Sequence, residues 1–162
     1  MGRTFKIWFG PELKELFNQH PELNNLIKDF VAYKKGALLF NGDGIGYINA
    51  RYVLGRDAPY DLPPVCVDNA YHIHALEKDS QDHIIAKRRY PKNQYKWTSN
   101  NALIYCTHWT ESHKDEQDKS IFGILDFVTN AHVFNHSRKI ELENLVEEFE
   151  QAVDRDIEVE KW

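Results

Sequence analysis

Apolar residues near the start of the chain recur every three to four positions, which is the spacing of one face of a helix. The strongest stripe consists of Leu23, Leu26, Ile27, Phe30 and Val31. Pro11 and Pro21 stand where a helix tolerates proline, in its first turn, and Gly36 follows the stripe as a typical terminator. The pattern predicts two helices within residues 1–36.

Later segments alternate with the two-residue period of a strand. Residues 71–76 and 102–109 place their side chains alternately on two faces, whereas 120–128 is apolar on both faces apart from Asp126. A strand of the latter kind is typically buried on both sides. A helical stripe then returns and predicts a C-terminal helix: Leu142, Leu145, Val146, Phe149 and Val153.

This succession predicts an α+β fold, with helices on one face of an antiparallel sheet of about four strands. A chain of 162 residues with 42% hydrophobic content is expected to form a single domain around one core. Within it we distinguish a helical part (1–36), a glycine-rich insertion (37–54), the sheet (55–136) and an acidic C-terminal helix and tail (137–162).

The net charge of −5 is unevenly distributed. Residues 141–160 hold nine carboxylates and one base, whereas 84–97 hold five bases and no acid. The basic segment interleaves its cations with aromatic rings, a composition typical of surfaces that bind single-stranded RNA. The residues predicted to contact RNA are Lys87, Arg88, Arg89, Tyr90, Lys92, Lys96 and Trp97. A solvated loop between strands remains the alternative.

No apolar run approaches the roughly 20 residues that span a bilayer, and the N-terminal residues lack the apolar core of a signal peptide. We therefore expect a cytoplasmic protein without a membrane partner. Cys66 and Cys106 lie in or beside predicted strands without a CxxC spacing, which favours buried free thiols over a disulfide or a metal site.

Residues 55–74 concentrate one arginine, three aspartates, two tyrosines and two histidines within twenty positions. Gly55 permits a positive φ, and Pro59 and the prolines after it stiffen the chain, so we predict a rigid, displayed loop that leads into a strand. Since side chains alternate along that strand, His72 and His74 should point to the same face.

Five sequence islands carry a family resemblance: GRDAPYD (55–61), HIH (72–74), NALIYC (101–106), ILDFV (124–128) and AHVFNHSR (131–138). Together they resemble the YafO family of bacterial toxins, whose members are similar in size and expected fold to the RelE-type, ribosome-dependent mRNA endonucleases. The resemblance implies a type II toxin that cleaves mRNA on the ribosome, needs no cofactor or metal, and has a cognate antitoxin protein as partner.

Cleavage of RNA without a metal requires a base for the 2′-hydroxyl, an acid for the leaving oxygen and a cation near the phosphate. His72 and His74 are candidates because imidazole titrates near neutrality, although a structural role for each stays open. We predict that Arg56 acts on the phosphate and that Asp57 is structural. Asp61 could orient a histidine or the arginine, or cap a turn instead.

The resemblance further implies a substrate-facing His132 and an Arg138 at the phosphate. His132 and His136 also have the i, i+4 spacing of helical metal ligands, so a metal hydrolase that uses His72, His74, His132 and His136 is one alternative. Another is a non-catalytic module that blocks translation or binds a partner. In one respect the chain departs from RelE-like toxins, which usually carry basic or aromatic catalytic groups near the C-terminus, whereas this chain ends in the mostly acidic DRDIEVEKW.

Overall fold

The computed structural model describes residues 5–45, 51–60, 67, 69–109, 117–129, 136–156 and 158–162. Three residues that the sequence singled out, Asp61, Cys66 and His132, lie outside these ranges. In chain order the elements are β1 (Lys6–Phe9), α1 (Leu13–Gln19), α2 (Glu22–Lys34), β2 (Tyr52–Pro59), β3 (Ala70–Glu77), α3 (Gln81–Arg89), a short 3-10 turn η1 (Gln94–Lys96), β4 (Ala102–Trp109), β5 (Gln117–Val128), α4 (His136–Arg155) and β6 (Val159–Lys161). No helix in these ranges is long and apolar enough to cross a membrane.

The strands form one mixed sheet in the order β2-β3-β4-β5-β1-β6. From β2 to β5 each strand pairs antiparallel with the next. β1 then adds to β5 in parallel, and β6 pairs antiparallel with β1. The α+β class is confirmed, but the prediction of about four strands missed β1 and β6, which have only 4 and 3 residues and therefore show little alternation.

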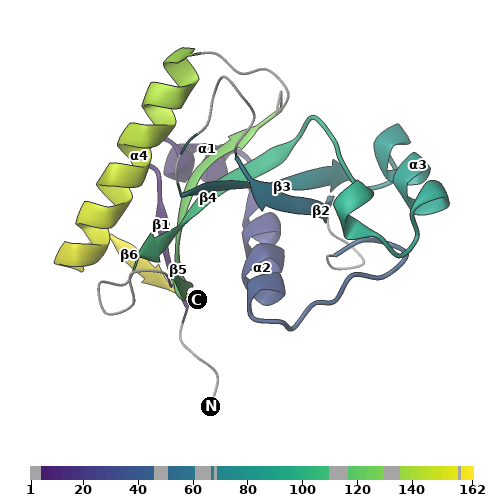
Figure 1. Cartoon of the computed structure of the whole chain (residues 1–162), viewed down its shortest axis with the longest axis horizontal. Coiled ribbons are helices and arrows are strands. Elements are labelled where there is room, and N and C mark those ends of the chain that lie inside the picture. The colour runs from purple at the N-terminus through teal and green to yellow at the C-terminus, as the bar shows by residue number, and fades with distance from the viewer. Residues whose placement is uncertain are drawn as a thin grey trace.

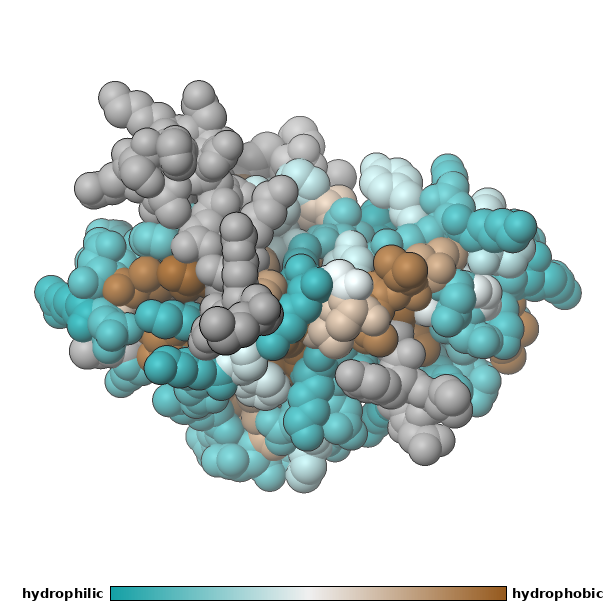
Figure 2. Space-filling model, turned by 90° about the horizontal axis from the view of Figure 1, so that it is seen from below, coloured by the Kyte–Doolittle hydropathy of each residue, from teal (hydrophilic) through white to brown (hydrophobic). Residues whose placement is uncertain are grey.

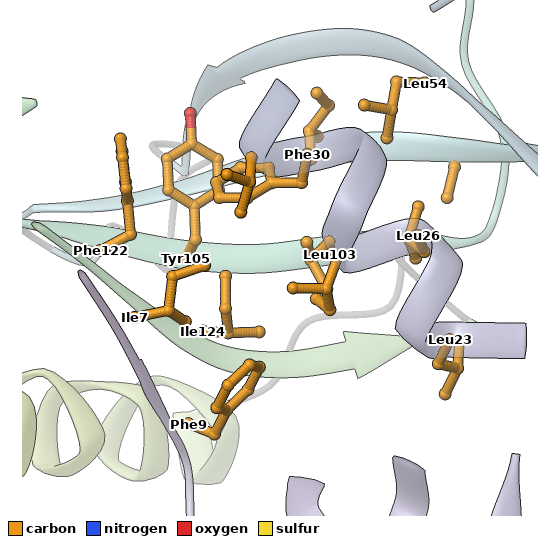
Figure 3. Packing of buried hydrophobic residues seen from close by; sticks show 14 of the residues in the cluster. Ile7, Phe9, Leu23, Leu26, Phe30, Leu54, Leu103, Tyr105, Phe122 and Ile124 are labelled. Carbon is orange, nitrogen blue, oxygen red and sulfur yellow. The ribbon is translucent and has the colours of Figure 1, made fainter. Parts of the chain in front are cut away.

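Helices cover both faces of the sheet, so the prediction of helices on one face is wrong (Figure 1). α1 and α2 pack on one face, where Leu23, Leu26 and Phe30 of α2 point at sheet residues (Figure 3). α4 packs on the other face through Leu142 and Phe149. The two-sided coverage explains why β5 is apolar on both faces.

The close packing of α4 depends on a glycine in β5. A Cβ on Gly123 would come within 2.8 Å of both the Phe149 ring and Cys106 Sγ. Only a residue without a side chain leaves room for Phe149, which is fully buried there. Cys106 is a buried free thiol, as predicted, and burial raises its pKa.

The predicted loop at 55–61 is instead largely strand, because β2 continues to Pro59 as an edge strand with a bulge between Leu54 and Asp57. Gly55 does not have a positive φ. It is needed because a Cβ there would collide with the backbone carbonyl of Trp97, which accepts a hydrogen bond from the Arg56 N–H at 2.8 Å. The sequence therefore located a backbone constraint at Gly55 but misassigned its cause.

Asp57 joins the edge strand to α2. Lys34 Nζ lies 2.6 Å from Asp57 Oδ2 and 2.7 Å from the Tyr105 hydroxyl, which itself donates to Asp57 Oδ1 at 2.5 Å. Burial, assisted by the Asp57 carboxylate, raises the pKa of Tyr105 well above its usual value. These contacts support the structural role predicted for Asp57, with Lys34 as its ionic partner.

The basic segment is not a loop throughout, because its first half belongs to α3. Ser80 caps this helix by accepting a hydrogen bond from the His83 N–H. Lys87, Arg88 and Arg89 occupy the last turn, where positive charge opposes the negative end of the helix dipole. α3 and α4 lie at opposite ends of the sheet, with β3 and β4 between them (Figure 1).

Candidate functional site

His72 occupies the middle of one row of residues that crosses the sheet. Ala58, His72, Ile104 and Asp126 are opposite one another on successive strands from β2 to β5. Ile104 packs in the cluster that α4 covers, so this row lies on the α4 face. The histidine and the aspartate of two non-adjacent strands are thereby placed on the same surface.

The neighbourhood of His72 follows from alternation along β3. His72, His74 and Leu76 share one face, and Leu76 packs against Ala86 of α3 and Trp97. Ala102 and Ile104, which lie opposite His74 and His72, pack in the α4 cluster. His72 is therefore placed between the part of this face covered by α3 and the part covered by α4.

Tyr60 packs against His72 at the end of β2. The two rings meet edge to face, with their centroids 5.4 Å apart. The tyrosine is 2% exposed, and burial raises its pKa to about 12, although the nearby Arg138 guanidinium acts in the opposite direction. Tyr60 therefore keeps its proton near neutral pH and fixes one side of the His72 ring. Nδ1 of His72 is buried.

Arg138 reaches the same region from the first turn of α4. Its Nη2 donates to Asp126 Oδ2 at 2.9 Å, and the other carboxylate oxygen accepts from the Phe127 N–H at 2.8 Å. Burial raises the pKa of Asp126, while Arg138 lowers it. A guanidinium has five N–H donors, and the contact with Asp126 uses one of its nitrogen atoms.

His74, although next to His72 on this face, is held by the backbone. It is 2% exposed, and its Nδ1 lies 2.8 Å from the Ser99 carbonyl oxygen and 3.1 Å from the Ser99 nitrogen. The rings of His72 and His74 contact each other with centroids 5.1 Å apart. This environment favours a structural role for His74, whose ring packs against the ring of His72.

Arg56 lies apart from this cluster, at the bulge of the edge strand. Its guanidinium stacks 4.3 Å from the centroid of the Tyr95 ring and donates to the Tyr95 carbonyl oxygen. Tyr95 is 59% exposed, so the stacked pair is presented to solvent. The structure thus groups Arg56 with the basic segment and not with His72.

Six of the seven residues predicted to contact RNA are exposed: Lys87, Arg88, Arg89, Tyr90, Lys92 and Lys96. Lys87 forms an ion pair with Asp43. Trp97 does not fit the prediction of a base-stacking surface, because its ring is fully buried against Leu76 and Ala86 and its Nε1 donates to the Tyr90 carbonyl oxygen. Tyr95, which also belongs to the basic segment, has an exposed ring that could stack on a base where Trp97 does not.

Two predicted site residues, Asp61 and His132, lie outside the described ranges, so no contact is assigned to them. Among the described residues, no three His, Cys, Asp or Glu side chains are grouped closely enough to hold a metal ion.

Sequence reasoning did not assign a role to Tyr60 or Asp126. Tyr60 stood within the GRDAPYD island, and Asp126 was the one charged residue in an otherwise apolar strand. A lone carboxylate at such a position is costly unless it has a partner, which is the signal that could have identified it.

Comparison with known proteins gives one family match. Residues 31–151 match the family described as toxin YafO of type II toxin-antitoxin systems. No curated protein and no solved structure matches the chain.

Proposed function

The chain belongs to the YafO family of type II toxin-antitoxin toxins, which implies an antitoxin partner; from this premise we propose that it is an mRNA endonuclease that acts on the ribosome and stops translation. The observation that carries the proposal is the convergence of His72 from β3, Arg138 from α4 and Tyr60, the residue after β2, on one face of the sheet.

In the proposed reaction, the neutral imidazole of His72 takes the proton from a ribose 2′-hydroxyl. The 2′-oxygen then forms a bond to phosphorus as the bond between phosphorus and the 5′-oxygen breaks. Arg138 stabilises the charge that develops on the phosphate oxygens. Tyr60 is a positioning residue, because its burial keeps it behind the His72 ring. The 5′-oxygen leaves with a proton from a general acid, a role for which we propose His132.

RNA reaches this face, in the proposal, across the basic surface at the end of α3. That surface consists of Lys87, Arg88, Arg89, Tyr90, Lys92 and Lys96 with the stacked pair Arg56–Tyr95. Exposed tyrosines offer stacking faces to unpaired bases, and arginine and lysine neutralise phosphates. Since phosphate contacts position RNA without cleaving it, loss of this surface should weaken binding and leave the chemistry intact.

The test is cleavage of one defined mRNA in a purified translation mixture. His72→Gln and Arg138→Gln should each slow cleavage by about 100-fold or more, the usual effect of removing an acid-base group or a charge-stabilising donor. Both variants should still sediment with ribosomes.

His20→Gln and Arg155→Gln are matched controls, since both replace the same residue types at exposed positions far along the chain from the cluster. They should cleave at the parental rate. Translation arrest with intact mRNA would favour the non-catalytic alternative and remove the proposed chemistry.

A further inference from the structure

A hollow of about 450 Å³ lies between α1, β5 and α4, and no residue of the basic surface lines it. Its walls include Leu13, Leu16, Leu125 and Leu145, of which Leu13 and Leu125 are buried and the other two are half-buried. Through Leu16 and Leu145, part of this apolar lining is in contact with solvent. The face drawn in Figure 2 is largely hydrophilic, with apolar groups exposed in several places.

The hollow continues along α4. A smaller hollow of about 130 Å³ shares Pro11 and Glu148 with it and extends to Arg155. From Glu141 to Arg155 the helix rises by about 21 Å. We name these two adjacent hollows together the α4 trough. Its elongated form suits a stretch of polypeptide better than a compact small molecule.

Carboxylates surround the trough. Glu12, Glu141 and Glu148 are exposed at its rim, and none of them has an ion pair within the described part of the chain. Glu141 and Glu12 also act on Asp126, whose pKa they raise in addition to the effect of burial. Several like charges thus converge around an apolar floor. Among the lining residues Arg155 is the cation, at the far end, and Arg138 is paired with Asp126 beside the trough.

The apolar floor and the acidic rim together determine which kind of molecule can bind in the trough. RNA is excluded because its phosphates would be repelled by the rim. A polypeptide segment that carries apolar side chains flanked by lysine or arginine would bury the leucines and neutralise the glutamates together. The family supplies a protein partner, the antitoxin.

We infer that the α4 trough is the docking surface for a cationic, apolar segment of the antitoxin. The inference rests on family membership and not on the proposed RNA cleavage. The trough lies on the α1 side of α4, whereas the basic surface is at the α3 end of the sheet, so the antitoxin and RNA contact separate surfaces of the toxin. Asp126 alone belongs to both the trough and the His72 cluster.

The test compares two triple variants of equal net charge. The trough variant is Glu12→Gln, Glu141→Gln, Glu148→Gln. The control variant is Glu15→Gln, Glu143→Gln, Glu147→Gln, which removes three exposed carboxylates from the same two regions outside the trough. The probe is a labelled helical peptide of about 14 residues, the length of the trough, with leucines on one face and lysines beside them.

The lysine peptide should bind the parent and the control variant alike, and the trough variant at least ten-fold more weakly, with a smaller salt dependence. A peptide with glutamate in place of lysine should not bind. Equal affinity for the two triple variants, or no binding to the parent, would overturn the inference. If the trough variant failed to fold, the single change Glu141→Lys provides the same comparison.

A second measurement uses the cognate antitoxin, which we expect to be encoded beside the toxin gene. In the complex of the two full-length proteins, backbone amides of residues 10–16 and 141–152 should exchange hydrogen more slowly than in the free toxin. Unchanged exchange in both segments would show that the antitoxin docks elsewhere and would overturn the assignment.

Discussion

Replacing Asp57 with alanine should destabilise the fold, whereas replacing its neighbour Arg56 should not. In the native state the Lys34 ammonium lies 2.6 Å from the Asp57 carboxylate, and the two side chains are 19% and 14% exposed. Asp57→Ala removes the carboxylate and leaves the ammonium largely desolvated beside Tyr105, with no anion to compensate its charge.

The magnitude follows from this burial. Breaking a buried ion pair by removing one partner costs about 3–5 kcal/mol. A hollow of about 330 Å³ beside Lys34 and Asp57 admits water, which solvates the remaining ammonium in part. We therefore expect a loss of about 2–4 kcal/mol in the free energy of unfolding for Asp57→Ala. The double variant Lys34→Met, Asp57→Ala should recover a large part of this loss, because neither charge is then left alone.

Urea unfolding followed by far-UV circular dichroism measures these differences. Arg56→Ala loses an exposed stacking contact with Tyr95 and should cost only about 1 kcal/mol or less in stability, while it should weaken RNA binding and leave the chemistry intact. Asp43→Ala is a matched control, because it breaks the exposed ion pair with Lys87 and should leave the unfolding midpoint unchanged. If Asp57→Ala were as stable as the parent, or if the double variant were less stable than the single one, the structural role of the pair would be refuted.

Three further predictions concern pH, charge and metals. The raised pKa values of Tyr60 and Tyr105 mean that the folded state holds these protons more tightly than the unfolded state. The free energy of unfolding should therefore be at its full value below about pH 10 and fall as the pH rises toward 12, by about 2–3 kcal/mol for Tyr60 alone. A urea midpoint that stays constant over this range would contradict the prediction. Changing Lys87, Arg88 and Arg89 to glutamine should weaken ribosome association. The slope of the logarithm of the association constant against the logarithm of salt concentration should become shallower by about two to three, and nearer two because Lys87 already pairs with Asp43. An unchanged slope would mean that these residues do not contact RNA. Cleavage should persist in the presence of a chelator at constant ribosome integrity, and stoichiometric zinc in the purified protein would count against the reaction described above.

Periodic patterns predicted the parts of the fold that bury long apolar stripes. The helices around Phe30 and Phe149 and the strands around His72 and Tyr105 were each predicted within a few residues of their observed bounds. These elements repeat their apolar positions often enough for the period to be read from one sequence. β1 and β6 are too short for this, and their pairing depends on contacts with β5 and with each other that no local pattern encodes.

Proline and glycine signals were harder to interpret. The prolines after Gly55 suggested a loop, yet Pro59 ends a strand at the sheet edge, where a missing N–H is tolerated. Gly55 is required by the approach of the Trp97 backbone from a segment about forty residues away, which is a tertiary constraint. Basic residues around Arg88 likewise suggested a loop because α3 buries only His83 and Ala86, too few residues to form an apolar stripe.

For the candidate site, alternation placed His72 and His74 on one face, and the structure agrees. It could not separate them, because the burial of His74 against Ser99 depends on a loop that follows η1. The pair between Asp126 and Arg138 joins β5 to the start of α4, a contact that only the folded chain creates. Residue types in the sequence thus suggested which groups could take part in the proposed chemistry, while the assignment of partners required the fold.

The most direct test of the central claim is the chemical identity of the ends produced when the toxin acts on ribosome-bound mRNA. If His72 activates the ribose 2′-hydroxyl, the upstream fragment should end in a 2′,3′-cyclic phosphate and the downstream fragment should begin with a 5′-hydroxyl, and both products should disappear in His72→Gln while ribosome binding persists. Full-length mRNA on arrested ribosomes, or fragments that carry a 5′-phosphate, would contradict the account.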